Sequence, residues 1–113
     1  MIRASRGDVW LVDLEPVAGH EQGGTRPCVV VSDDAYNGLP IAMAIVVPLT
    51  GRDRGFQHQP PVRTGRSGLT RDSRARPEDV RAVSFARFSR RLGLVEPDEL
   101  DAIATVLRLF LRL

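Results

Sequence analysis

The sequence predicts a mainly β domain, a small twisted β-barrel with one C-terminal helix laid against it. Two observations lead to this prediction. Short segments rich in β-branched residues alternate with Gly- and Pro-containing turns over most of the chain, whereas residues 96–113 carry apolar side chains at helical spacing. A length of 113 residues is typical of one compact domain, so we expect a single domain over residues 1–113.

Two strands and a loop are expected in the first third of the chain. Residues 7–14 (GDVWLVDL) are rich in β-branched and aromatic side chains and form the first expected strand. Residues 17–25 contain three glycines and form a mobile loop. Residues 26–32 (RPCVVVS) resume as a strand, and their continuous apolar run predicts burial of both faces. A turn over residues 33–40 follows, with Asn37-Gly38 as its strongest signal.

The middle of the chain predicts further strands. Residues 41–49 (IAMAIVVPL) form the most hydrophobic strand, and Pro48 should mark a sheet edge or a bulge, because proline cannot donate a ladder hydrogen bond. A basic loop with glycines covers residues 50–59. Weaker patterns predict short strands at residues 61–64, 67–70 and 80–85.

The last segment predicts an amphipathic helix. It begins behind Pro97 and has an acidic first turn, both of which favour a helix start. The apolar stripe of this helix must pack on another surface. The stripe consists of Leu100, Ile103, Ala104, Leu107, Phe110 and Leu111.

Charge is distributed unevenly along the chain. The formal net charge is only +2, but residues 51–95 carry 11 arginines against 4 acids, whereas residues 1–50 carry 3 against 6 and residues 96–113 carry 2 against 4. All sixteen basic residues are arginine, whose planar guanidinium suits phosphate. The middle of the chain is therefore the expected binding region for a polyanion.

Several classes of protein are not expected. No apolar run approaches the roughly 20 residues of a membrane span and the N-terminus lacks the core of a secretion signal, so we expect a cytoplasmic protein that does not contact the membrane. The single cysteine, Cys28, can form neither an internal disulfide nor a zinc site, and we expect it to be a buried small hydrophobe. His20 and His58 are far apart and have no ligand partners at familiar spacing. We therefore expect no metal and no cofactor.

Two strand ends carry the candidate chemistry. A flexible loop followed by a rigid strand places Arg26 at the first residue of that strand, where its backbone is fixed while its side chain can reach a ligand. The buried strand 41–49 ends at Thr50-Gly51 and presents a hydroxyl. Because two strand ends can meet at one rim, we expect Arg26 and Thr50 to act together.

These residues match a known family. Residues 7–16 (GDVWLVDLEP), 19–32 (GHEQGGTRPCVVVS) and 46–50 (VVPLT), together with Asn37, resemble the MazF/PemK (Kid) toxin ribonucleases of type II toxin–antitoxin systems. The resemblance implies a small SH3-like β-barrel with a C-terminal helix, and a symmetric homodimer that binds single-stranded RNA in a groove along the dimer interface. It also implies a cognate antitoxin that occupies the same groove.

The resemblance also implies a reaction and its residues. The 2′-hydroxyl of the RNA attacks the adjacent phosphorus without a metal and leaves a 2′,3′-cyclic phosphate and a 5′-hydroxyl. By position, Arg26 matches the catalytic arginine and Thr50 the catalytic hydroxyl residue of the family, and His20 and Glu21 match groove residues. The match is weaker at Arg76 and Glu78, where Glu78-Asp79 replaces the usual Asp-Gln. The expected RNA-binding residues are Gln22, Gly51, Arg52, Arg54, Arg76 and Arg81.

Attack by a 2′-hydroxyl builds negative charge on a pentavalent phosphorane, so the site needs fixed cationic donors and a group that moves the proton. Arg26 and Thr50 can supply the donors. A guanidinium stays protonated to above about pH 12, so we assign charge stabilisation to Arg26 and leave the proton to one of three residues. These candidates, which the sequence does not rank, are Glu21, His20 and Glu78.

Two other functions fit a chain of this kind. One is a non-enzymatic toxin on the same fold that poisons DNA gyrase through apolar residues at the helix end, and residues 107–113 (LRLFLRL) are apolar enough for it. The other is a module that binds RNA or a peptide on a barrel face without cleaving it. Four loop arginines fit either an RNA-binding patch or a solvated face: Arg52, Arg54, Arg63 and Arg66.

Overall fold

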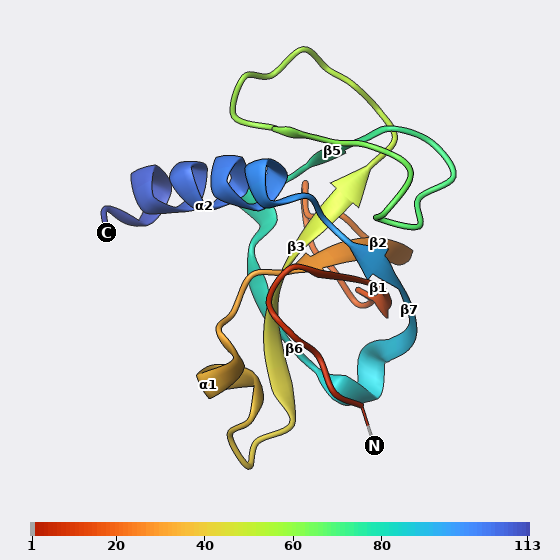
Figure 1. Ribbon diagram of the computed structural model, residues 1–113, viewed down its shortest axis with the longest axis vertical. Coiled ribbons are helices and arrows are strands. Elements are labelled where there is room, and N and C mark those ends of the chain that lie inside the picture. The colour runs from red at the N-terminus through yellow and green to blue at the C-terminus, as the bar shows by residue number, and fades with distance from the viewer. Residues whose placement is uncertain (1) are drawn as a thin grey trace.

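The computed structural model describes residues 2–113 and is mainly β, as the sequence predicts. A strongly curled antiparallel sheet forms a half-barrel, and one long helix lies along its side (Figure 1). The strands are β1 (Asp8–Asp13), β2 (Thr25–Val30), β3 (Met43–Thr50), β4 (Pro61–Val62), β5 (Ser73–Ala75), β6 (Arg81–Ser84) and β7 (Phe88–Leu94). The helices are α1 (Asp34–Asn37) and α2 (Pro97–Leu111), with short 3-10 helices η1 (Pro77–Asp79) and η2 (Phe85–Arg87).

Strands β1, β2 and β3 form the centre of the sheet and are buried on both faces. In β2, Cys28, Val29 and Val30 are fully buried, which confirms the prediction for this strand. Alternate residues point to opposite faces of a strand, and the core accordingly divides into two clusters. Cys28 and Val30 face a cluster inside the curl, together with Trp10. Val29 faces the other cluster, which lies under α2.

Strand β3 changes partners along its length. Its first half pairs with β6 from Met43 to Val46, whereas Leu49 and Thr50 pair with β5. Pro48 lies between these two pairings and pairs with Cys28 of β2 on its other side. The strand is therefore central rather than at a sheet edge, and Pro48 occupies the place where its outer neighbour changes. Because proline has no N–H to donate, this is the position at which a missing ladder bond is tolerated.

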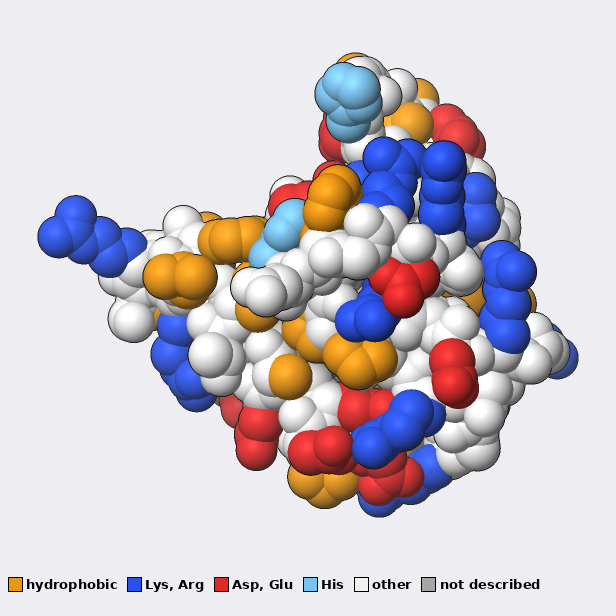
Figure 2. Space-filling view, turned by 90° about the horizontal axis from the view of Figure 1, so that it is seen from above, with side chains coloured by type: hydrophobic (Ala, Val, Ile, Leu, Met, Phe, Trp, Pro, Cys, Tyr) orange, Lys and Arg blue, Asp and Glu red, His pale blue; other side chains and the backbone are white. Residues whose placement is uncertain are grey.

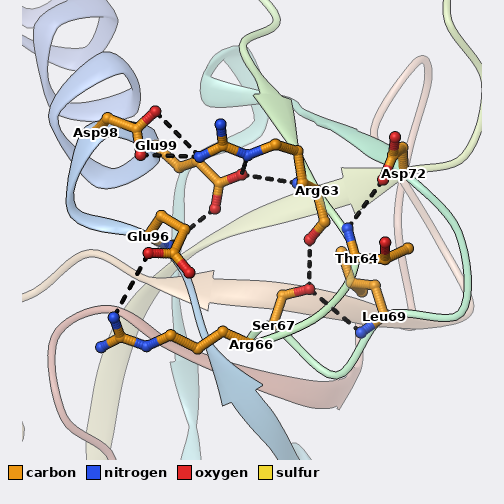
Figure 3. A network of polar contacts seen from close by, with 9 residues as sticks. All are labelled: Arg63, Thr64, Arg66, Ser67, Leu69, Asp72, Glu96, Asp98 and Glu99. Carbon is orange, nitrogen blue, oxygen red and sulfur yellow. Dashed lines mark hydrogen bonds and ion pairs between the residues drawn. The ribbon is translucent and has the colours of Figure 1, made fainter.

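Helix α2 begins where the sequence predicts and is fixed at its first turn. Pro97 follows the N-cap residue Glu96, and Glu99 completes a capping box by accepting a hydrogen bond from the Glu96 N–H at 2.9 Å. The Glu99 carboxylate is buried and also accepts from the backbone N–H of Arg63 at 2.7 Å and its Nε at 2.9 Å (Figure 3). The same network holds the loop after β4 against the helix.

The apolar stripe of α2 packs along only part of its length. Ile103 is fully buried and Leu100 and Leu107 pack beside it in the cluster under the helix. Beyond that turn the side chains of Phe110 and Leu111 are exposed, so the sheet covers only the first part of the stripe. Helix α2 projects past the sheet (Figure 1), and in its last turn the Phe110 ring lies 5.8 Å from the His58 ring, centroid to centroid, while Leu109 and Leu111 are exposed.

Other boundaries also differ from expectation. Residues 67–70 form turns instead of a strand, and residues 34–37 of the expected turn form the single-turn helix α1. Strands β5 and β7 have no counterpart in the sequence prediction. In the part of the chain that the structure describes, no helix has the length and apolarity needed to cross a membrane.

Candidate functional site

Arg26 and Thr50 lie at one rim of the sheet. Arg26 stands near the start of β2 and Thr50 ends β3, and each lies two residues beyond the paired Cys28 and Pro48. The antiparallel register therefore carries both residues to the same end of the strand pair, as expected. They line one pocket of about 270 Å³, which we call the arginine pocket. Its lining residues are Gln22, Arg26, Thr50, Gly51, Arg52, Arg54, Gln59, Arg71 and Arg76.

The arginine pocket has a strongly positive lining. Five of its nine lining residues are arginines and none is a carboxylate. Figure 2, seen from the side of the loop after β3, shows several arginine side chains gathered on one side of this face. Like charges brought together at a concave surface attract and concentrate an anionic ligand. The pocket is therefore built for a phosphate or another oxyanion rather than for a cation.

The two central side chains are held by their own backbone surroundings. The Arg26 Nε donates a hydrogen bond to the carbonyl of Gly23 at 3.0 Å, which fixes the stem of this exposed side chain. Within residues 2–113 its two terminal nitrogens have no hydrogen-bond partner, so they can donate to a ligand. The Thr50 hydroxyl oxygen accepts from the Arg52 N–H at 3.2 Å, and its proton remains available.

Arg76 has a different position from the other arginines of the pocket. It is largely buried, and its guanidinium donates to the Gln22 Oε1 at 2.6 Å and to the His20 carbonyl at 3.1 Å. It also pairs with Asp79 at 3.0 Å, and Asp79 accepts from the Gln22 N–H at 2.9 Å. Arg76 and Asp79 together hold the β1–β2 loop against η1. Much of the charge of Arg76 is thereby neutralised, and its visible role is to position Gln22.

The loop after β3 is fixed near its start by a second arginine. Asp53 accepts hydrogen bonds from the Gly55 N–H at 2.8 Å and from the Arg74 guanidinium at 3.1 Å. The Gly55 N–H, and then the Arg74 hydrogen bond, lower the pKa of this exposed carboxyl. Asp53 therefore stays ionised and holds the loop that carries Arg52 and Arg54.

The three proton-transfer candidates do not line the arginine pocket. Glu21 is exposed and accepts from the Ala18 N–H at 2.9 Å within its own loop. His20 is exposed, and only its carbonyl contacts Arg76. Glu78 lies closest, because it accepts from the Nε2 of Gln59, a lining residue, at 2.7 Å. Of the three candidates, Glu78 is therefore the one that contacts the lining of the pocket.

Arg81 also lies away from the pocket. It is on β6, donates to the carbonyl of Leu14 at 3.1 Å, and does not join the lining residues. The structure likewise separates the four loop arginines that the sequence left undecided. Arg52 and Arg54 line the pocket, whereas Arg63 and Arg66 pair with acids at the start of α2 at 2.9 Å and 3.6 Å.

Three residues of the site were missed by the sequence analysis. Arg71 and Gln59 line the pocket, and Asp79 holds Gln22. Arg71 lies among eleven arginines in one segment, and no local signal separates it from the others. The replacement of the family's glutamine by Asp79 was visible in the sequence, but its contact partner lies 57 positions away.

The lone cysteine lies in the core beneath the site. Cys28 is fully buried, which confirms the expectation of a small hydrophobe. Burial raises the pKa of its thiol to about 12, and the nearby charge of Arg81 opposes this only in part. Within residues 2–113, no cluster of three or more His, Cys, Asp or Glu side chains could hold a metal ion.

Comparison with known proteins gives a consistent result. Residues 5–111 match the family model described as PemK-like, MazF-like toxin of type II toxin-antitoxin system. The chain is similar to Endoribonuclease MazF9 of Mycobacterium tuberculosis, with 34% identity over 113 residues covering 96% of both chains. It is also similar to Endoribonuclease toxin MazF of Escherichia coli K12, with 37% identity over 98 residues covering 86% of this chain and 84% of that one.

Solved structures with the same fold include a toxin alone and a toxin bound to its partner. The crystal structure of MazF from Deinococcus radiodurans superposes with a TM-score of 0.87 at 25% identity and covers 100% of both chains. An endoribonuclease in complex with its cognate antitoxin, from a mycobacterial species, superposes with a TM-score of 0.73 at 26% identity. That match covers 100% of this chain and 97% of the other.

Proposed function

The chain belongs to the PemK-like, MazF-like family of toxins of type II toxin–antitoxin systems, and from this premise we propose that it cleaves single-stranded RNA at the arginine pocket. The observation that supports the proposal best is the composition of that pocket, which joins five arginines to the hydroxyl of Thr50 and contains no carboxylate. Such a lining binds a phosphodiester and can stabilise the charge that develops on it. Relatives at 34% and 37% identity are endoribonucleases.

The proposed reaction needs no group outside the RNA and the protein. The 2′-hydroxyl of the RNA gives up its proton to a base and attacks the adjacent phosphorus; the bond to the 5′-oxygen of the next nucleotide breaks, and this oxygen takes up a proton. A 2′,3′-cyclic phosphate and a 5′-hydroxyl remain. The terminal nitrogens of Arg26 donate to the non-bridging oxygens, and Thr50 donates its available proton to the same phosphate. DNA lacks the attacking hydroxyl and should bind without being cut.

The proton of the attacking hydroxyl requires an acceptor. Glu78 is our first candidate because it contacts the lining residue Gln59, whereas Glu21 and His20 lie exposed on the β1–β2 loop and do not line the pocket. We expect Glu78→Gln to lower the cleavage rate most and to remove the acidic limb of the rate profile. Measured rates against pH for Glu78→Gln, Glu21→Gln and His20→Ala would show this, and a Glu78→Gln profile identical to that of the wild type would exclude Glu78.

The test of the whole proposal is cleavage in the presence of a chelator. Purified protein with EDTA should cut a single-stranded transcript and leave cyclic-phosphate ends. Arg26→Gln and Thr50→Val should each reduce cleavage by about 10²–10³-fold, the usual effect of losing one transition-state donor. Arg3→Gln, a change at an exposed arginine outside the pocket and away from the last turn of α2, is the matched control. Intact RNA that is nevertheless bound would indicate a binding module, and inhibition of DNA supercoiling would indicate a gyrase poison.

The proposal extends to partners and location. We propose that a cognate antitoxin neutralises this chain by covering the arginine pocket with acidic residues, as charge complementarity requires. We also propose that the chain forms a homodimer, in line with the exposed last turn of α2. Because messenger RNA is translated in the cytoplasm, the proposed substrate places the protein there.

A further inference from the structure

Arg71 and Gly51 form an unusual contact at the floor of the arginine pocket. Gly51 follows Thr50 directly, and its backbone does not adopt a positive φ. A side-chain carbon built at this glycine would overlap the Nη2, Cζ and Nε atoms of Arg71. The Arg71 guanidinium therefore lies flat against the glycine, in the space that a Cβ would fill. Gly51 is needed here for room and not for its backbone freedom.

The Arg71 side chain is not held by any acid. No carboxylate lies within 4.0 Å of its guanidinium in the part of the chain that the structure describes, and no hydrogen bond from it is formed there. Arg74 and Arg76 differ in this respect, because they pair with Asp53 and with Asp79. The charge of Arg71 is thus fully available to a ligand, whereas those of its two neighbours are largely compensated.

Arg71 also lies where two pockets meet. A second pocket of about 240 Å³ adjoins the arginine pocket, and the residues shared by both linings are Arg26, Gly51 and Arg71. The wall of the second pocket is partly apolar and includes Leu11, Leu49 and Leu69. A strand of RNA that enters the arginine pocket and continues into the second one has to pass both Arg26 and Arg71, because each of them lines both pockets.

We propose that Arg71 is a second phosphate-binding arginine of the active site, facing Arg26 across the RNA backbone, and that Gly51 is the space that keeps it there. The inference rests on the proposed ribonuclease function and adds a substrate-contacting residue to it. Two guanidinium groups on opposite sides can each donate to a non-bridging oxygen of the backbone. The contact with Gly51 restricts the Arg71 side chain before the RNA binds, which reduces the entropy lost on binding.

The first test is cleavage of a transcript by Arg71→Gln. We expect kcat/KM to fall by about 10–100-fold, as for the loss of one charged hydrogen bond, while the melting temperature stays unchanged because the side chain is exposed. The matched control Arg3→Gln, at an exposed arginine outside both pockets and away from the last turn of α2, should keep full activity. A value for Arg71→Gln within twofold of the wild type would overturn the inference. If the wild type itself does not cut RNA, it is the proposed function that fails.

The second test measures binding separately from chemistry. An oligonucleotide that carries a 2′-deoxy residue at the mapped cleavage position cannot be cut, and its dissociation constant can be followed against salt. Each phosphate contact to a single strand contributes about 0.7 to the slope of log K against log salt. Arg71→Gln should reduce the slope by about that amount, and an unchanged slope would contradict a phosphate contact.

The third test uses Gly51 to move Arg71 without removing it. In Gly51→Ala the new methyl group displaces the flexible end of Arg71, so we expect a loss of activity close to that of Arg71→Gln. In the Arg71→Gln background the same change should have little further effect. This double-mutant cycle separates the proposed role from a direct effect of the added methyl group on Thr50. Equal losses in both backgrounds would show that the contact has no functional role.

Discussion

Ionisable side chains that are close together in this sequence can lie in very different surroundings, some in the core and some at the surface. Cys28 is the clearest example, because its thiol is fully buried in the core two residues along β2 from the exposed Arg26. Burial raises the pKa of this thiol to about 12. An unfolded thiol ionises near pH 8.5, so the folded protein holds a neutral thiol over a range in which the unfolded chain holds a thiolate.

We therefore predict that the Cys28 thiol is unreactive in the folded protein. We also predict that the free energy of unfolding decreases at alkaline pH, because the thiol ionises in the unfolded chain before it ionises in the folded one. It should not react with a thiol reagent at pH 8 until the chain is unfolded. Because the pKa of the thiol is raised in the folded state, the contribution of Cys28 to the free energy of unfolding is complete below about pH 8.5. This contribution is lost as the pH rises from there towards 12, at about 1.4 kcal/mol per pH unit. Urea unfolding at pH 7 and pH 10 should show a loss of about 2 kcal/mol that is absent in Cys28→Val; equal losses in both proteins would contradict this.

At the scale of elements, the β1–β2 loop is held to η1 by Arg76. We predict that Arg76→Met releases this loop, because the guanidinium donates to both Gln22 and His20. Exchange of the Gln22 amide should accelerate by roughly tenfold to a hundredfold, since charged hydrogen bonds contribute about 1.5–3 kcal/mol. Arg74→Met is the matched control, as Arg74 contacts Asp53 instead. Hydrogen exchange monitored by NMR gives the measurement, and equal protection in both variants would exclude the role.

The start of α2 depends on Glu99, whose side chain is 4% exposed. We predict that Glu99→Gln lowers the free energy of unfolding by about 1–3 kcal/mol, because a buried acceptor for three donors is weakened. Asp98 also binds Arg63 but is 71% exposed, so Asp98→Asn should have a much smaller effect. Chemical denaturation of both variants checks the difference. If Asp98→Asn costs as much as Glu99→Gln, burial is not the cause.

The strands and the helix that were predicted correctly from the sequence are those in which apolar residues follow a clear local pattern. β1, β2, β3 and α2 have uninterrupted apolar or helical periodicity, and all four were placed within three residues of their observed ends. β5 has only three residues with Arg74 at its centre, and β7 carries the adjacent pair Arg90 and Arg91, so neither strand has a clear apolar pattern. Their pairing partners in β3 and β1 decide their structure, and no local pattern records this.

The same division applies to the site. Arg26 and Thr50 were predictable because each stands at the end of a strongly patterned strand, and two adjacent antiparallel strands bring such ends together. Arg71 reaches the pocket from a loop between β4 and β5, and its position depends on a contact with a glycine 20 positions earlier. Residue spacing along the sequence does not predict which side chains of a long loop will lie in the pocket.

At the scale of the whole molecule, the last turn of α2 and the residues that follow it leave a group of apolar side chains exposed. Leu109 is 76% and Leu113 86% exposed, and Phe110 and Leu111 lie beside them. Exposed apolar patches of this kind mark association sites. We predict that a second copy covers this turn, giving a particle of about 25 kDa, twice the 12.5 kDa of the chain.

Light scattering after size exclusion measures this mass directly. Leu109→Asp should shift the protein towards 12.5 kDa, because a carboxylate in an apolar interface is costly to desolvate. Leu39→Asp, a change at another exposed leucine beside α1, is the control and should leave the dimer intact. A wild type that is monomeric at micromolar concentration would contradict the prediction.

The change of partner at Pro48 has a consequence for how such a protein diversifies. Up to that proline β3 belongs to the sheet core, and the two strand ends beyond it present Arg26 and Thr50, the proposed catalytic pair. Arg52, Arg54, Gln59 and Arg71, by contrast, come from the connections between β3 and β5. Substitutions in those connections, whether natural or in a combinatorial library, should therefore change which RNA sequence is bound, while the proposed catalytic pair and the strands that carry it stay the same.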